Sequence, residues 1–146
     1  MITIHNATIE DAQALTELFI SARSDMTYLA KLYTDDETLW WMTNIVFKEC
    51  EVRVARLGNV PVGFLARQQN TIEHLYVAPS QQSRKVGSVL LQEALQNGET
   101  LNLWVFQQNA RARAFYQRFG FKLLQETDGS RNEEKVPDAC YEWRKN

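Results

Sequence analysis

Apolar residues in the first third of the chain recur at intervals of three or four, the period of a helix with one buried face. Two such stripes occur, one formed by Ala12, Leu15, Leu18, Phe19 and Ala22 and the other by Leu39, Met42, Val46 and Cys50. Thr8, with Asp11 three residues later, is typical of the N-terminal cap of the first helix. The carboxylates of Asp35 or Asp36 suit the start of the second.

From residue 51 the pattern changes to the alternation that is typical of strands. Segments 51–57 and 60–66 alternate and are joined by Gly58 and Asn59, which favour a hairpin turn. Further strands are predicted at 2–4, 71–77, 101–106, 121–125 and 140–143, and further helices at about 85–97 and from Asn109 to Gly120. This order predicts an α+β or mixed α/β fold, a sheet with helices on both faces.

Composition narrows the class of protein. The 146 residues are expected to form a single domain, 1–146. Sixteen basic and eighteen acidic residues leave a formal charge of −2, which argues against nucleic-acid binding. Cys50 and Cys140 are expected to be free thiols, although a lone disulfide stays possible. No apolar run approaches the roughly 18 residues of a membrane span, and residues 1–5 do not resemble a secretory signal, so we expect a cytoplasmic protein without a membrane partner.

The segment 75–88 is the most informative for chemistry. A predicted strand leads through a short polar loop into a helix with Gly87 in its first turn. The free N–H groups at such a helix start would suit a pyrophosphate, and small residues would let it approach the backbone. A plain strand–loop–helix connection explains the segment equally well.

Two motifs resemble those of the GNAT superfamily, the Gcn5-related N-acetyltransferases. Gln82 falls on the first position of the family's Gln/Arg-x-x-Gly-x-Gly/Ala motif and Gly87 on its last, with Lys85 in place of the first glycine. Residues 109–121 match Asn-x-x-Ala-x-x-Phe-Tyr-x-x-x-Gly-Phe without substitution. The order of elements follows the family from Ile2 to Trp143.

The resemblance implies a mostly antiparallel, twisted sheet that splays between its fourth and fifth strands, with about four flanking helices. Acetyl-CoA would lie in the gap as cosubstrate, and no metal is expected. Strand 71–77 would pair with the pantetheine arm, and the loop after it would hold the pyrophosphate. The residues expected to bind the cofactor are Leu75, Tyr76, Val77, Gln82, Ser83, Arg84, Lys85, Val86, Gly87, Ser88 and Asn109.

Amine acetylation requires a base for the amine and an acid for the leaving thiolate. Tyr116 matches the family's usual acid, although it also shares a helix face with core aromatics. Glu73 is the favoured base, because strand alternation would place it on the same side as Leu75. His74 on the opposite side, a water relay or a residue elsewhere stay open as alternatives.

The acceptor is predicted less sharply. The aromatic and acidic side chains that would shape its pocket are Tyr28, Trp40, Trp104 and Glu133. One of Trp40 and Trp41 is expected to fill the core, and a purely solvated role for the acids of the loop 127–138 stays open as an alternative. These residues favour a small cationic amine, while a protein amine is also open. A homodimer is possible. The alternative function is a non-catalytic acyl-CoA-binding or regulatory module, which the missing glycine at Lys85 would favour.

Overall fold

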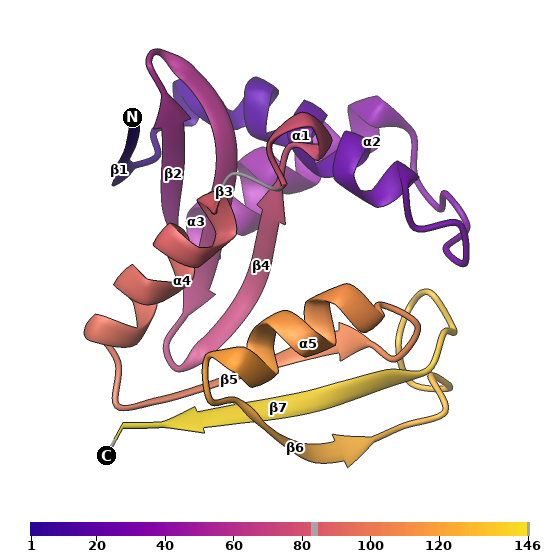
Figure 1. The fold of residues 1–146 in the computed structure, drawn as a ribbon. Coiled ribbons are helices and arrows are strands. Elements are labelled where there is room, and N and C mark those ends of the chain that lie inside the picture. The colour runs from indigo at the N-terminus through magenta and orange to yellow at the C-terminus, as the bar shows by residue number, and fades with distance from the viewer. Residues whose placement is uncertain (83–84, 146) are drawn as a thin grey trace.

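The computed structural model describes residues 1–82 and 85–145. They form one seven-stranded sheet with helices on both faces (Figure 1). Its strand order is β1-β2-β3-β4-β5-β7-β6. The strands are β1 (Ile2–Asn6), β2 (Glu51–Leu57), β3 (Val60–Gln68), β4 (Thr71–Val77), β5 (Thr100–Phe106), β6 (Lys122–Glu126) and β7 (Asp138–Arg144). Among the described residues, no helix combines the length and apolarity needed to cross a bilayer.

The sheet divides the hydrophobic core into two clusters, one on each of its faces, and helices cover both. The helical elements are η1 (Ile9–Asp11), α1 (Ala12–Ser24), α2 (Asp35–Trp41), η2 (Met42–Val46), α3 (Phe47–Glu49), η3 (Pro79–Gln81), α4 (Val86–Gln96) and α5 (Ala110–Arg118). Leu90, Leu103 and Tyr141 belong to the first cluster, under α4 and α5. Phe19 and Phe64 belong to the second, under α1 to α3. The mixed α/β fold with about four flanking helices is thereby confirmed.

Local hydrogen bonds explain where the first two helices begin. The backbone N–H of Thr8 donates to Asp11 at 2.9 Å, and a short 3₁₀ turn precedes α1. At α2 the cap is Thr34, whose hydroxyl accepts from the N–H of Glu37 at 3.1 Å while the Glu37 carboxylate accepts from the Thr34 N–H at 2.9 Å. This reciprocal pair stabilises the start of α2. The predicted start at Asp35 is correct, but Thr34 rather than an Asp side chain makes the cap.

The sheet splays between β4 and β5, its only parallel neighbours among the described strands. Register pairs join these two strands only at Thr71 with Asn102 and at Ile72 with Leu103. Beyond these pairs the strands diverge, with β4 running away from β5 and β7 (Figure 1). The predicted splay between the fourth and fifth strands is therefore confirmed. It leaves one edge of β4 and one edge of β5 without a neighbouring strand.

A glycine on β3 lets α4 approach the sheet closely. A Cβ atom at Gly63 would lie 2.9 Å from Cγ1 of Val86, the first residue of α4. Gly63 pairs with Val77, the last residue of β4. The close contact therefore holds the N-terminus of α4 beside the open end of β4, where the splay is widest.

Candidate active site

The open edges of β4 and β5 present unpaired backbone groups to the gap between them. Ile72 is the last residue of β4 that pairs with β5; β4 continues for five residues beyond it, and β5 continues to Phe106. On its other edge β4 stays paired with β3 up to Val77, where Gly63 is the partner. The free N–H and C=O groups of β4 need partners, which an extended ligand lying in the gap would provide. Leu75, Tyr76 and Val77 lie on this stretch, as the sequence predicted.

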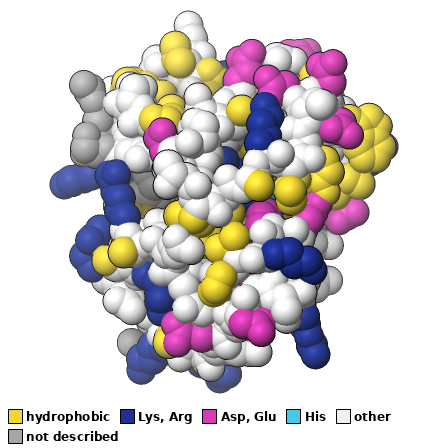
Figure 2. Space-filling model, turned by 90° about the vertical axis from the view of Figure 1, so that its right-hand side faces the viewer, with side chains coloured by type: hydrophobic (Ala, Val, Ile, Leu, Met, Phe, Trp, Pro, Cys, Tyr) yellow, Lys and Arg dark blue, Asp and Glu magenta, His cyan; other side chains and the backbone are white. Residues whose placement is uncertain are grey.

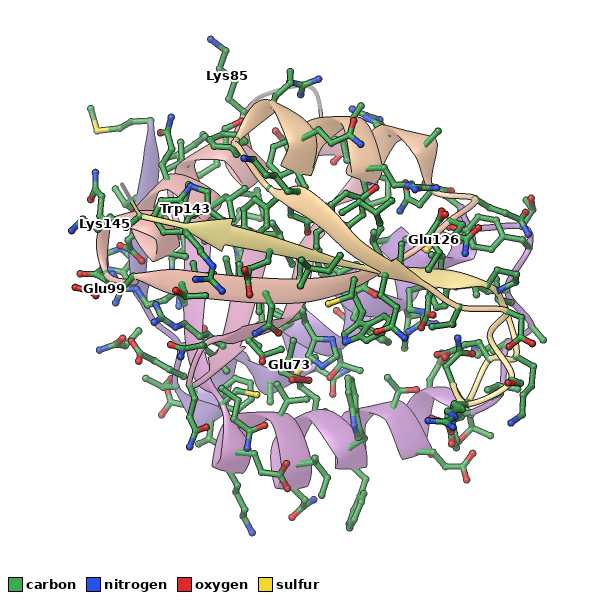
Figure 3. All side chains as sticks on the ribbon, turned by 90° about the horizontal axis from the view of Figure 1, so that it is seen from below. Glu73, Lys85, Glu99, Glu126, Trp143 and Lys145 are labelled. Carbon is green, nitrogen blue, oxygen red and sulfur yellow. The ribbon has the colours of Figure 1, made fainter. Side chains whose placement is uncertain are left out.

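The N-terminus of α4 faces the end of this gap. Lys85 caps the helix with φ of 65° and ψ of 16°, the left-handed conformation that glycine adopts most easily. This explains physically why a glycine is usual at that motif position. The side chain of Lys85 is exposed and extends away from the helix (Figure 3).

The first three residues of α4 offer backbone N–H groups rather than side chains. Among the described residues, the first i→i−4 bond of the helix runs from the N–H of Val89 to the carbonyl of Lys85 at 3.1 Å, and the N–H groups of Val86, Gly87 and Ser88 belong to the turn before it. The Val86 side chain is buried in the first core cluster. A Cβ at Gly87 would make ordinary contacts of 3.6 Å with Phe115 and Val77. These three N–H groups form the strongest candidate anion site.

An arginine that the sequence reasoning did not select reaches this loop from α5. Nη1 of Arg111 donates to Oε1 of Gln82 at 3.1 Å, and Nε2 of Gln82 donates to the carbonyl of Val77 at 3.4 Å. Arg111 thus brings a cation to the predicted pyrophosphate loop. Its place inside the 109–121 motif was the available signal. Ser83 and Arg84, also predicted to bind the cofactor, lie outside the described residues.

Asn109 caps α5 as predicted. Its side-chain oxygen accepts from the N–H of Ala112 at 3.1 Å. Its backbone N–H donates to the carbonyl of Phe106, the last residue of β5, at 3.0 Å. These bonds connect the open end of β5 to the helix that carries Tyr116.

Tyr116 lies on α5 with its ring packed against Phe115 and Phe121, at centroid distances of 5.3 and 5.6 Å. Burial raises the pKa of its phenol above the ordinary 10.0, and the nearby Tyr76 adds to the increase. The side chain is therefore both a core aromatic and a protonated hydroxyl at neutral pH. The hydroxyl can donate this proton to the sulfur of a leaving thiolate as the C–S bond breaks.

The predicted orientation of Glu73 is wrong, because the strand is irregular at that residue. Arg67 pairs with Ile72 and Ala66 pairs with His74, so Glu73 is an extra residue in β4. Such a bulge interrupts the alternation of side chains. Leu75 packs against the first core cluster. Glu73 instead lies on the side of α2 and α3 (Figure 3), where its charge contributes to the raised pKa of Cys50.

His74 is a poor candidate for the base. Its ring packs edge-on against Trp41 at 5.0 Å and Phe19 at 6.1 Å, and burial together with the Arg23 charge lowers its pKa to about 4. A base with such a low pKa accepts an amine proton only weakly at neutral pH. Cys50 and Cys140 are free, as predicted, and burial raises the pKa of both thiols.

The predicted acceptor residues lie at different places on the side of α1 and α2. Tyr28 packs edge-on against Phe106 of β5 at 6.0 Å. Trp104 of β5 is 49% exposed, and Trp40 of α2 is 61% exposed. Trp41 is the tryptophan that joins the core, as expected for one of the pair. Figure 2 shows acidic and hydrophobic side chains gathered at the upper right of this side of the molecule.

An ion pair connects the end of α1 to the loop between β6 and β7. Nη2 of Arg23 lies 2.9 Å from Oε2 of Glu134, and the two side chains are only 23% and 19% exposed. Glu133, the predicted acceptor residue of this loop, is exposed, and the acid that pairs with Arg23 is its neighbour Glu134. Sequence reasoning missed Arg23; its position four residues after Phe19, in the last turn of α1, was the available signal.

The β6–β7 loop is held by its own hydrogen bonds rather than being simply solvated. Nδ2 of Asn132 donates to the carbonyl of Val136 at 2.7 Å and to Asp138 at 3.1 Å. The Thr127 hydroxyl also bonds the Asp138 carboxylate. These contacts give Glu134 a defined position.

Comparison with known proteins agrees with the resemblance to acetyltransferases that the motifs and the splayed sheet indicate. Residues 48–123, more than half of the chain, match the family model described as acetyltransferase (GNAT) domain. The peptidyl-lysine N-acetyltransferase YjaB of Escherichia coli is 28% identical over 110 residues, covering 74% of this chain and 67% of YjaB. An uncharacterised N-acetyltransferase of the same organism, YafP, is 27% identical over 132 residues, covering 86% and 84%.

Solved structures agree in fold. The solution structure of apo YjaB has a TM-score of 0.80 at 23% identity, covering 98% of this chain and 97% of that protein. The PaiA N-acetyltransferase of Thermoplasma acidophilum, solved in complex with coenzyme A, has a TM-score of 0.73 at 25% identity and covers 99% of both chains. The chain therefore belongs to the GNAT acetyltransferase family and is an acetyl-CoA-dependent N-acetyltransferase.

Proposed function

We propose that acetyl-CoA lies in the gap between β4 and β5 and that its acetyl group passes directly to an amine. The observation that carries this proposal is the pairing of β4 and β5 at only two positions, next to the N–H groups of the first turn of α4. An extended arm would pair with β4 beyond Ile72, and a diphosphate would accept from Val86, Gly87 and Ser88. Lys85 and Arg111 would add positive charge nearby.

The two faces of the sheet supply different parts of the reaction. The amine nitrogen forms a bond to the thioester carbonyl carbon, the C–S bond breaks, and the thiolate takes a proton from Tyr116. The proton lost by the amine passes to Glu73 through water, because the Glu73 carboxylate lies on the side of α2 and α3 and is exposed. The cofactor and acceptor would therefore enter from opposite faces. No covalent enzyme intermediate is required.

A lysine side chain is the acceptor class that we favour. YjaB is named as a peptidyl-lysine N-acetyltransferase. Exposed aromatic residues and the acidic start of α2, with Asp35, Asp36 and Glu37, would also favour a cationic amine on this side. A lysine within a protein and a small amine are both compatible with the exposed position of Trp104.

A non-catalytic acyl-CoA-binding module is the less favoured function. It was suggested by the loss of the motif glycine at Lys85, but Lys85 adopts the left-handed conformation that a glycine would adopt. The backbone geometry of the loop therefore does not depend on glycine.

The decisive test incubates the protein with acetyl-CoA and a panel of amines while free thiol is measured. We expect thiol release that depends on an amine, together with a mass increase of the acceptor by one acetyl group. If calorimetry detects CoA binding but no amine in the panel is acetylated, the binding module becomes the better description.

A further inference from the structure

Five side chains meet on the acceptor side of the gap, and we call them the Arg23 cluster: Arg23, Tyr28, Tyr76, Phe106 and Glu134. The Arg23 guanidinium carbon lies 5.8 Å from the ring centroid of Phe106. The Arg23 charge also opposes the increase in pKa that burial causes at Tyr28 and Tyr76. The cluster thus joins α1, β4, β5 and the β6–β7 loop at the open end of the splay (Figure 1).

Arg23 uses few of its hydrogen-bond donors. A guanidinium has five N–H donors. Within residues 1–82 and 85–145, the Arg23 guanidinium donates to Glu134 at 2.9 Å and also lies close enough to the Tyr76 hydroxyl for a weaker hydrogen bond. By contrast, Arg53 makes two bonds to Glu93 and one to Asn6. Arg23 therefore retains donors for a ligand.

A second donor in the same cluster lacks a partner. The hydroxyl oxygen of Tyr28 is buried and makes no hydrogen bond to any residue that the structure describes. A buried hydroxyl without a partner costs free energy, which a ligand oxygen would recover. Tyr28 packs against Phe106, and so does the Arg23 guanidinium. The two donors thus lie around one ring.

The surroundings strengthen an interaction with an anion. The guanidinium carbon lies 5.2 Å from the Phe19 centroid as well as near Phe106, so two aromatic rings shield it from water. Shielding from solvent lowers the local dielectric and strengthens a charge-assisted hydrogen bond. Among the residues that the structure describes, Glu134 supplies the carboxylate that pairs with Arg23, through a single oxygen at 2.9 Å.

We propose that Arg23 and the Tyr28 hydroxyl bind a carboxylate or carbonyl oxygen that the acceptor carries on the same molecule as its reactive amine. Glu134 holds the guanidinium in place and competes with this oxygen. The inference rests on the proposed function, since it concerns the acceptor of the same reaction. It favours a lysine, free or in a peptide, over a simple diamine, and it makes Arg23 a specificity-determining residue.

The test compares three acceptors that share one amine chain. Cadaverine has no oxygen, L-lysine adds a carboxylate, and Nα-acetyl-L-lysine N-methylamide adds the carbonyls of a peptide. We expect kcat/KM of the wild type to be at least about tenfold higher for one of the two oxygen-bearing acceptors than for cadaverine. Which of the two is preferred identifies the source of the oxygen as a free carboxylate or a peptide backbone.

Two variants separate recognition from a purely structural role. Arg23→Met keeps the length and the aromatic contacts, and should remove the preference while activity toward cadaverine persists. Glu134→Gln frees the guanidinium, and should strengthen the preference by a few-fold. Glu93→Gln breaks the Arg53–Glu93 pair, which has similar exposure, and should leave the preference unchanged. Binding of CoA, measured by calorimetry, checks that each variant is folded.

The outcomes distinguish failure of this inference from failure of the proposed function. If the wild type acetylates amines but Arg23→Met keeps the preference, Arg23 does not recognise the acceptor and the proposal is overturned. If Arg23→Met and Glu134→Gln instead lose activity equally with all three acceptors, the ion pair has a structural role only, and the proposal is overturned as well. If the wild type acetylates none of the three, the proposed lysine-type acceptor and the role of Arg23 both fall.

Discussion

At the scale of single residues, Tyr116 offers the clearest test of the mechanism. Replacing it with Phe removes only the hydroxyl and keeps the packing against Phe115 and Phe121. We expect turnover to fall on the order of 10²-fold, the usual contribution of one acid–base group, while the Kd for CoA stays nearly unchanged. Steady-state kinetics and calorimetry measure the two quantities. Unchanged turnover would remove Tyr116 from the mechanism.

The raised pKa of Tyr116 adds a dependence on pH. Burial stabilises the neutral phenol, so the hydroxyl stays protonated at and somewhat above pH 10, the ordinary pKa. The acid role therefore should not limit kcat below about pH 10. The same shift stabilises the folded protein below the unfolded pKa of 10, and this contribution is lost as pH rises above that value.

Replacing Glu73 and replacing its neighbour His74 should have different effects on the pH dependence of the rate. Glu73→Gln should lower kcat/KM, because an amide cannot receive the amine proton that the carboxylate would accept. His74→Gln should leave the shape of the pH–rate profile between pH 6 and 8 unchanged, because the pKa of His74 is about 4 and the ring is already neutral there. Rate profiles of both variants decide the matter. An altered profile for His74→Gln alone would reverse the assignment.

Lys85 allows backbone strain to be separated from charge. Its φ of 65° costs a non-glycine residue about 1 kcal/mol. Lys85→Gly should therefore be more stable than Lys85→Ala by about 1 kcal/mol, although both remove the ammonium group. Urea unfolding measures the difference. If both variants bind CoA equally and less tightly than the wild type, the charge of Lys85 contributes to binding; equal affinity in all three proteins would make it a bystander.

At the scale of elements, Gly129 determines whether the β6–β7 loop can form. Its φ is 83°, and a Cβ there would lie 2.3 Å from the carbonyl carbon of Val136. Gly129→Ala should lower the free energy of unfolding by about 2 kcal/mol or more, and it should lower KM for an oxygen-bearing acceptor, since a displaced Glu134 competes less for Arg23. Thermal or urea unfolding and acceptor kinetics provide the measurements.

Gly58→Ala is the matched control for this prediction. Gly58 also has a positive φ, 64°, but an added Cβ would meet nothing within 4 Å. The cost should be about 1 kcal/mol, from the backbone conformation alone. Equal destabilisation by the two substitutions would show that the close contact at Val136 relaxes without cost.

At the scale of the whole molecule, the cofactor should join the two halves of the splayed sheet. Beyond Ile72, the edge of β4 toward β5 has no strand partner. Saturating CoA should slow amide hydrogen exchange in this part of β4 by at least about tenfold, because an extended ligand protects the free donors. Amides of β3, which is paired on both edges, serve as the control. Protection confined to α4 would place CoA outside the gap.

Local pattern alone was enough for the elements and the family. The strand at Thr71–Val77, the cap at Asn109 and the left-handed glycine at Gly120 follow from period, capping and backbone freedom within a few residues. The motifs around Gln82 and Tyr116 are also continuous in sequence. Such features can be predicted from the sequence because each depends only on residues that are close together along the chain.

The tertiary structure alone decided which side chains share a surface. The bulge that turns Glu73 away from the side of Leu75 depends on pairing with Ala66 and Arg67. Arg23 meets Glu134 across 111 positions of sequence. Neither relation has a local signal, because it is set by how strands pair and helices pack. The sequence therefore determined the elements, the family and the candidate acid, whereas the orientation of the candidate base and the composition of the acceptor side required the folded molecule.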